Sequence, residues 1–267
     1  TNVAKNSLID RNTTVSNLRN LLASFGERKC KIYLLHGRLK DSEMAGLYTH
    51  PKIKAISFTG GTQTGAYIAK TAAPMFKKLS LELGGKNPNI IFADADFDKA
   101  VSIASRAAFT NQGQICLCGS RLFIQEEIYE KFKEALILKA SKLVVGDPKE
   151  SSTNLGAVVS KEHMQKILSK IDEAKELGGK ILIGGKRKIL KAELEKGYYI
   201  EPTIIEGLSY NCSINQEEIF GPVVSLIPFK TEEEVIEMAN STKYGLSASI
   251  FTENISKAHR VAANIEA

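Results

Sequence analysis

Residues 81–92 read Leu-Glu-Leu-Gly-Gly-Lys-Asn-Pro-Asn-Ile-Ile-Phe, and the segments around them decide the class of fold. Leu79 to Leu83 has the composition of a short strand and ends at two glycines. Asn89 to Phe92 predicts a second strand, followed by acidic residues that can cap a helix. Apolar residues then recur at helical spacing over 97–109. The stretch therefore predicts a strand, a glycine turn, a strand and a helix in immediate succession.

The same alternation of strands and helices continues in both directions. Further strands are expected at 31–35, 53–58, 122–125 and 246–251. Further helices are expected at 15–24, 66–73, 161–177, over Ile128 to Leu136, and after the capping box at 231–234. Alternation on this scale is typical of an α/β fold with a largely parallel sheet. We expect two units that meet near Gly84, one over 1–83 and the other over 84–267.

Composition and charge exclude several classes of protein. The 267 residues are 43% hydrophobic and 25% charged, which is ordinary for a globular protein of one large or two smaller domains. No apolar run approaches the roughly 20 residues of a membrane helix, and the first fifteen residues lack the apolar core of a secretory signal. The net charge of +6 is spread along the chain. We therefore expect a cytoplasmic protein with no membrane or nucleic-acid partner.

The four cysteines indicate free thiols rather than a metal site or disulfides. Cys30, Cys116, Cys118 and Cys212 form no CxxC pair, and no second pair completes a zinc site with Cys116 and Cys118. No metal is expected. None of the four histidines is placed in the sequence as an evident partner for a thiol.

A glycine turn follows the strand expected at 53–58. Gly60, Gly61 and Gly65 lie between this strand and a helix start, where backbone N–H groups can face a phosphate. The strict GxGxxG spacing is absent, so a tight turn without a ligand is an equal interpretation.

Three other segments contain residue types that can perform chemistry. Glu82 lies in an otherwise apolar strand, either facing solvent at the strand end or serving as a general base tuned by partial burial. Cys116 follows a polar, glycine-containing loop and is either a reactive thiol or an inert core residue. Glu217 and Glu218 precede a Gly-Pro turn and either lie in a solvated loop or accept hydrogen bonds from sugar hydroxyls.

Taken together, these segments resemble the aldehyde dehydrogenase superfamily. The matching motifs, in the family's order, are FTGG, LELGGKNPNIIF, NQGQIC, EPTI and EEIFGP. Glu82 and Cys116 are 34 residues apart, as the family pattern requires. The sequence ICLCGSRLFIQ over 115–125 is most similar to the 2-aminomuconic semialdehyde dehydrogenase branch. The resemblance implies a partial Rossmann-like dinucleotide-binding domain over 1–83 and a catalytic domain over 84–267.

The resemblance also implies roles for individual residues. Cys116 would attack the aldehyde carbon, and Glu82 would activate the water that hydrolyses the thioester. Glu218 would hold the nicotinamide ribose, and Phe220 would pack near the nicotinamide ring. The glycines implied at the cofactor are Gly60, Gly61, Gly65 and Gly84. The implied cofactor is NAD, with NADP as the alternative, the substrate is an aldehyde, and the full-length family member is a homo-oligomer.

The chain departs from the family pattern in ways that leave other functions open. It is shorter than full-length members, and with no tryptophan it has no counterpart of the oxyanion-binding Asn that follows a Pro-Trp pair. Only Lys5 lies where the family's adenosine-ribose Lys is expected. A binding or scaffold protein without activity is therefore the alternative to an enzyme. A cofactor-free cysteine hydrolase is a third hypothesis, which would leave the glycine turn unexplained.

Overall fold

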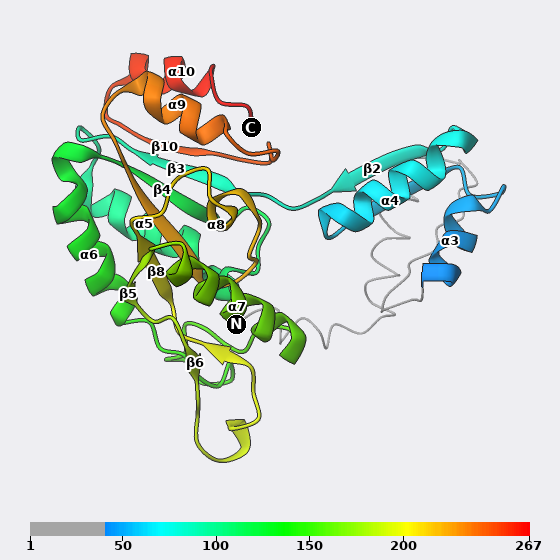
Figure 1. The fold of residues 1–267 in the computed structure, drawn as a ribbon, viewed down its shortest axis with the longest axis horizontal. Coiled ribbons are helices and arrows are strands. Elements are labelled where there is room, and N and C mark those ends of the chain that lie inside the picture. The colour runs from blue at the N-terminus through cyan, green and yellow to red at the C-terminus, as the bar shows by residue number, and fades with distance from the viewer. Residues whose placement is uncertain (1–40) are drawn as a thin grey trace. The chain divides into compact units, whose positions relative to one another are not determined.

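The computed structural model describes residues 41–267 and divides into two compact units, one ending at Leu83 and the other beginning at Gly84. Both are drawn in Figure 1. The helix expected at 15–24, the strand expected at 31–35 and Lys5 lie outside the described residues. Within the described residues, no helix is long and apolar enough to cross a membrane.

The first unit contains a parallel βαβ arrangement. Its elements are α3 (Asp41–Thr49), β1 (Ala55–Thr59), α4 (Thr62–Ala72), a 3-10 helix (Ala73–Met75) and β2 (Lys78–Glu82). β1 and β2 pair in parallel, with Thr59 opposite Glu82. A side chain at Gly65 on α4 would overlap Leu83, so glycine at this position lets the helix approach the end of β2 closely. The strand, turn and helix expected from residue 53 onward are present; β1 begins two residues later than expected, and α4 begins four residues before the expected 66.

The second unit is built on a six-stranded sheet. Its strands are β3 (Asn87–Ile91), β4 (Gly119–Gln125), β5 (Lys180–Ile183), β8 (Thr203–Glu206), β9 (Val223–Phe229) and β10 (Ser249–Phe251). Their order is β10-β3-β4-β9-β8-β5, and every neighbouring pair is parallel except the antiparallel pair of β5 and β8. A separate two-stranded ribbon joins β6 (Arg187–Lys188) and β7 (Tyr199–Ile200). The expected α/β class with a largely parallel sheet is confirmed.

Helices cover both faces of this sheet. They are α5 (Phe97–Phe109), α6 (Tyr129–Ser141), α7 (Lys161–Glu176), α8 (Ser213–Gln216), α9 (Glu232–Asn240) and α10 (Ile255–Ala262). Short 3-10 helices lie at Thr110–Gly113, Glu126–Ile128 and Ala192–Leu194. Asp96, Ser160 and Thr231 each accept a hydrogen bond from the backbone N–H three residues later, so the cap residues visible in the sequence do begin helices.

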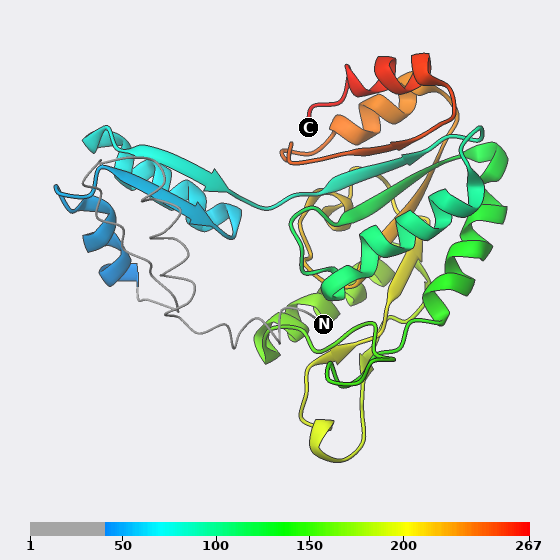
Figure 2. The same cartoon turned by 180° about the vertical axis from the view of Figure 1, so that it is seen from behind.

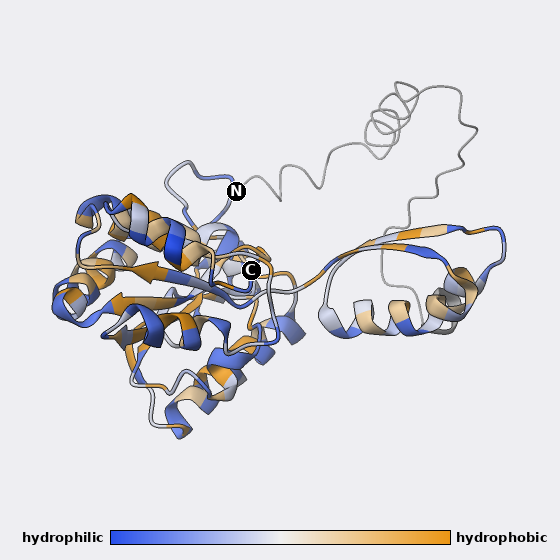
Figure 3. Ribbon diagram, turned by 90° about the horizontal axis from the view of Figure 1, so that it is seen from above, coloured by the Kyte–Doolittle hydropathy of each residue, from blue (hydrophilic) through white to orange (hydrophobic). Residues whose placement is uncertain are grey.

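Alternate residues of β9 show how the layers are filled. Val224 and Leu226 pack in one core with α5 and α6, which Figure 2 shows in front of the sheet. Val223 packs in a second core with α7 and α8, and Ile227 packs in a third core with α9 and α10. These four helices cover the opposite face of the sheet, which faces the viewer in Figure 1. In Figure 3 the strands are mostly orange and the helices alternate orange with blue. The sheet is therefore buried on both faces, as parallel sheets require.

The expected boundaries are right for the two helices at 97–109 and 161–177 and less accurate for α4, which begins four residues early, for α6, which ends at Ser141, and for the strands. The helix at 97–109 is observed at those residues, and α7 ends one residue before the expected 177. The strand expected at 246–251 covers only Ser249–Phe251. β8 and β9, in the middle of the sheet, were not expected at all. Strands buried on both faces lack the alternation of apolar and polar residues that signals a half-buried strand.

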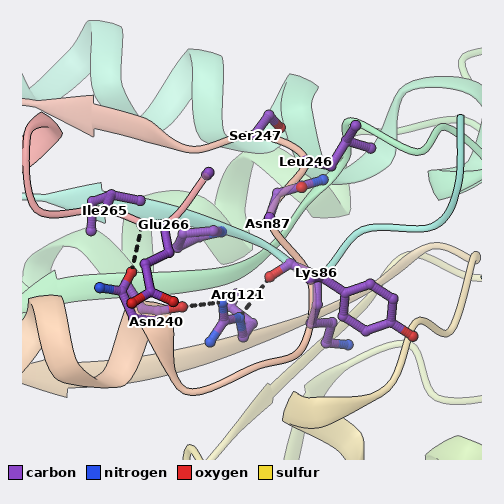
Figure 4. A pocket seen from close by; sticks show the side chains of 13 residues that line it. Lys86, Asn87, Arg121, Asn240, Leu246, Ser247, Ile265 and Glu266 are labelled. Carbon is purple, nitrogen blue, oxygen red and sulfur yellow. Dashed lines mark hydrogen bonds between the residues drawn. The ribbon is translucent and has the colours of Figure 1, made fainter.

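Arg121, near the start of β4, joins three elements of the second unit. Its side chain is buried, and its guanidinium donates hydrogen bonds to Lys86 O at 2.8 Å, Met238 O at 2.9 Å and Ala239 O at 2.8 Å. Figure 4 shows it between the beginning of β3 and the end of α9, beside a small pocket. Burial lowers the pKa of Arg121 to about 10, so the group stays charged at neutral pH.

Replacing Arg121 with Met is expected to lower the free energy of unfolding by about 3 kcal/mol, because Lys86 O and Ala239 O lose their donor inside the protein and Met238 O keeps only its bonds from Ser241. Urea denaturation of the two proteins measures the difference. Arg106→Met is the matched control, since the Arg106 side chain is exposed on α5, and it should stay within about 0.5 kcal/mol. Equal effects of the two substitutions would contradict the role given to Arg121.

Candidate active site

Cys116 lies in a tight turn that follows three residues of left-handed backbone. Asn111, Gln112 and Gly113 have φ of 53°, 57° and 69°. The Cys118 N–H then donates to Ile115 O at 3.0 Å, which closes a turn around Cys116. The Cys116 side chain is half-buried, and its backbone N–H makes no hydrogen bond to the described residues. The predicted nucleophile thus lies in a bent loop, with a free N–H donor on its own backbone.

Asn87, the first residue of β3, fixes this turn to the sheet. Its Nδ2 donates to Cys116 O at 2.6 Å and to Cys118 O at 3.0 Å. Asn87 is buried, and its Oδ1 has no hydrogen-bond partner among the described residues. Sequence reasoning did not select Asn87. The available signal was a polar side chain beside a Gly-Gly pair at the start of a buried strand.

The Cys118 thiol, two residues after Cys116, lies in a largely buried environment. Burial raises the pKa of the Cys118 thiol to about 11, and the nearby Cys116 and Glu218 raise it further than burial alone. Cys118 is therefore a protonated thiol at neutral pH. Its backbone carbonyl, rather than its sulfur, helps to hold the turn, because it accepts a hydrogen bond from Asn87.

Glu218 and Gly84, two of the predicted cofactor residues, lie together. Glu218 Oε1 accepts a hydrogen bond from the Gly85 N–H at 3.1 Å. A Cβ at Gly84 would overlap Glu218 Oε2, so a larger residue here would displace this carboxylate. Oε2 itself makes no hydrogen bond to the described residues. The carboxylate is therefore oriented through one oxygen and has the other available as an acceptor.

Phe220, a third predicted cofactor residue, has an unusual backbone. Its φ is 59°, a left-handed conformation that costs a non-glycine residue about 1–2 kcal/mol. His163 Nε2 lies 2.7 Å from Phe220 O, and the two rings meet edge to face with centroids 6.1 Å apart. A hydrogen bond contributes about 0.5–1.5 kcal/mol net, which is comparable with the strain. His163 was not selected by sequence reasoning, because its partner lies 57 residues away.

The loop of Cys116 and the loop of Glu218 are in direct contact. A Cβ added to Gly113 would overlap the carbonyl group of Gly221. Gly113 also has positive φ, so both space and backbone conformation require glycine. The structure therefore brings the NQGQIC and EEIFGP segments together in the second unit.

The first unit holds the remaining predicted residues. Gly61 precedes α4 in an extended conformation, and no side chain caps this helix start. The Gly60 N–H donates to Glu82 O at 3.0 Å. Thr62 Oγ1, at the first position of α4, is buried and has no hydrogen-bond partner among residues 41–267. Thr62 is a further residue that sequence reasoning did not select.

The side chain of Glu82 is exposed at the end of β2. The structure agrees with the solvent-facing interpretation of this residue, and the partial burial considered for a tuned base is not observed within the described residues. Gly65 contacts Leu83 in the packing of α4, as described above. Residues 41–267 contain no group of three or more His, Cys, Asp or Glu side chains that could hold a metal ion.

The second unit is thus a largely parallel α/β unit in which the loop of Cys116 packs against the loop of Glu218. The chain belongs to the aldehyde dehydrogenase family, whose model matches residues 20–267. It is 44% identical over 219 residues to 4-trimethylaminobutyraldehyde dehydrogenase A of Danio rerio, covering 82% of this chain and 43% of the relative. It is also 44% identical to 2-aminomuconic semialdehyde dehydrogenase of Homo sapiens, covering 82% of this chain and 46% of the relative.

A solved structure supports the same relationship. Betaine aldehyde dehydrogenase from Staphylococcus aureus, crystallised with NAD+, has 43% sequence identity to this chain and a TM-score of 0.80. The similarity covers 83% of this chain and 44% of that one. The chain thus spans less than half the length of these relatives. Members of the expected 2-aminomuconic semialdehyde dehydrogenase branch are among the matches, at the same identity as another branch.

Replacing Gly113 with Ala is expected to destabilise the second unit by about 3 kcal/mol or more, because the new methyl group meets the Gly221 backbone and φ is positive. Gly156→Ala is the matched control, since its Cβ would make only ordinary contacts, the nearest at 3.5 Å. Urea denaturation compares the two substitutions. Similar unfolding free energies would show that the two loops do not pack as described.

The raised pKa of Cys118 predicts how its alkylation depends on pH. Because thiolate is the nucleophile, only about one thousandth of Cys118 should be reactive at about pH 8 when its pKa is about 11. The rate of its reaction with iodoacetamide in the folded chain should rise about tenfold for each pH unit toward that pKa. Mass spectrometry of the alkylated peptide measures this rate. A plateau near neutral pH would contradict the buried environment of Cys118.

Proposed function

We propose that this chain takes part in the NAD-dependent oxidation of an aldehyde to a carboxylic acid, with Cys116 as the nucleophile. The observation that carries the proposal is the contact of both loops with Gly85. Its N–H donates to Glu218, and a Cβ on it would lie 2.8 Å from Cys116 O. The Cys116 backbone and the Glu218 carboxylate thus both contact one glycine, which supports a cofactor bound beside a nucleophile.

The residues present fit a nicotinamide dinucleotide. In the second unit, Glu218 Oε2 is an available acceptor for a ribose hydroxyl, and Phe220 lies two residues later. In the first unit, the uncapped start of α4 after Gly60 and Gly61 offers N–H groups to a pyrophosphate, and Thr62 Oγ1 lacks a partner. The betaine aldehyde dehydrogenase crystallised with NAD+ supports the same assignment.

The proposed chemistry uses the thiol and the carboxylate in sequence. The Cys116 thiolate adds to the aldehyde carbon, forming a carbon–sulfur bond and an oxyanion that the Cys116 N–H can stabilise. The hydride leaves this carbon for the nicotinamide ring, which is the chemistry the cofactor supplies. A water molecule then attacks the thioester while Glu82 takes its proton, and the carboxylic acid leaves with the thiolate restored. The domain roles of 1–83 as dinucleotide-binding and 84–267 as catalytic follow from these assignments.

Cys116→Ser is expected to lower aldehyde-dependent reduction of NAD by about 1,000-fold or more, because serine is a far weaker nucleophile at neutral pH. The appearance of reduced nicotinamide absorbance measures the rate, with a quaternary-ammonium aldehyde and a dicarboxylic semialdehyde as test substrates. Cys118→Ser is the matched control and should retain most of the rate. NAD should also slow the alkylation of Cys116 by iodoacetamide.

Two results would overturn the proposal. An unchanged rate in Cys116→Ser would remove Cys116 as the nucleophile. Absence of NAD reduction by the wild-type chain with both aldehydes, together with no effect of NAD on alkylation, would favour the alternative of a binding or scaffold protein.

A further inference from the structure

Three residues on one face of α7 contact the EEIFGP segment. His163, Ile167 and Lys170 are spaced four and three residues apart, so they lie on the same side of the helix. We call them the α7 contact stripe. Their contacts in the segment are Phe220, Gly221 and Glu217, respectively. The helix therefore holds this segment on both sides of Glu218.

The contact at Ile167 is close packing. Ile167 is fully buried, and a Cβ on Gly221 would lie 2.6 Å from its Cδ1. The contact at Lys170 is an ion pair, with Nζ 2.9 Å from a Glu217 carboxylate oxygen and 2.8 Å from one of Glu173. These two contacts leave little freedom for the segment to shift along the helix.

The contact at His163 is a directed hydrogen bond. A carbonyl oxygen only accepts, so Nε2 must carry the hydrogen that is donated to Phe220 O over 2.7 Å. The His163 backbone is itself fixed at the start of α7, because its N–H donates to the Ser160 hydroxyl at 3.2 Å. The bond therefore runs from a rigid helix start to the one residue of the segment whose φ is positive.

We propose that His163 is a positioning residue for the cofactor ribose. Its hydrogen bond holds Phe220 in the left-handed conformation, and this conformation keeps Glu218, two residues earlier, directed at Gly84 and Gly85. This inference rests on the proposed role of Glu218 as the ribose-binding carboxylate. His163 itself touches neither the thiol nor the substrate in this account and acts only through Glu218.

The first experiment measures NAD affinity by titration calorimetry in the full chain. His163→Phe removes the donor while keeping a flat ring, and it should weaken NAD binding about tenfold. His163→Gln keeps an N–H donor and should restore most of the affinity. His259→Phe, on the exposed side of α10, is the matched control and should bind as wild type. Thermal unfolding midpoints separate a local effect from loss of the fold.

A double-mutant cycle tests whether His163 acts through Glu218. Glu218→Gln alone should weaken NAD binding, and adding His163→Phe should then have almost no further effect. Equal, additive effects in the two backgrounds would overturn the inference, as would an unchanged affinity in His163→Phe.

A second readout does not use the cofactor. The Gly85 N–H is protected by Glu218, so its hydrogen exchange in the absence of NAD reports the position of that carboxylate. Exchange should be at least about fivefold faster in His163→Phe than in wild type and unchanged in His259→Phe. Lys170→Met removes a second contact of the α7 contact stripe and should also speed the exchange of the Gly85 N–H. If His163→Phe does not fold, the exchange rate in Lys170→Met provides the test. Unchanged exchange in the folded variants would overturn the role of His163.

The two readouts separate the inference from the proposed function. If wild type binds no NAD but His163→Phe speeds Gly85 exchange, the proposed function fails and the positioning of Glu218 by His163 stands. If wild type binds NAD and neither affinity nor exchange changes, the proposed function stands and the inference fails.

Discussion

Four consecutive residues, Gly84 to Asn87, make the contacts on which the second unit depends. The Gly85 N–H binds Glu218, Lys86 O accepts from Arg121, and Asn87 holds the turn of Cys116. Gly84 and Gly85 are closely approached by other groups. The Glu218 carboxylate lies against Gly84, and the Cys116 carbonyl lies against Gly85. Gly85, Lys86 and Asn87 are buried, so the Gly85 N–H, the Lys86 carbonyl and the Asn87 Nδ2 find their partners inside the protein. The geometry of the candidate site follows from satisfying them.

Backbone strain is concentrated in the two loops that these residues hold. Asn111 and Gln112 before the cysteine, and Phe220 after the glutamate, all have positive φ. Such conformations persist only where the surroundings impose them. Here the surroundings are the Gly113–Gly221 contact, the Asn87 amide and the His163 ring. These contacts hold the loops of Cys116 and Glu218 in fixed positions relative to each other, as the proposed function requires.

The proposed functional groups are divided between the units of the chain. The thiol of Cys116 and the carboxylate of Glu218 belong to the second unit, and Glu82 and the turn at Gly60 and Gly61 belong to the first. Membership of the aldehyde dehydrogenase family rests on both, since the family model matches residues 20–267. Within the described residues, the second unit contains a six-stranded sheet with helices on both faces. It therefore supports its part of the site through its own core.

The sequence by itself determined the α/β class and several helices with their caps, because these signals are local in the chain, and its resemblance to a known family singled out Cys116, Glu218 and Gly84. Only the tertiary structure decided that β9 lies at the centre of the sheet and that Asn87 and His163 support the site. The Glu218–Gly85 hydrogen bond joins residues 133 apart, and the His163–Phe220 bond joins residues 57 apart. Such partners are chosen by the packing of α7 and of neighbouring strands, and no short-range pattern of residue types records which distant groups that packing will bring together.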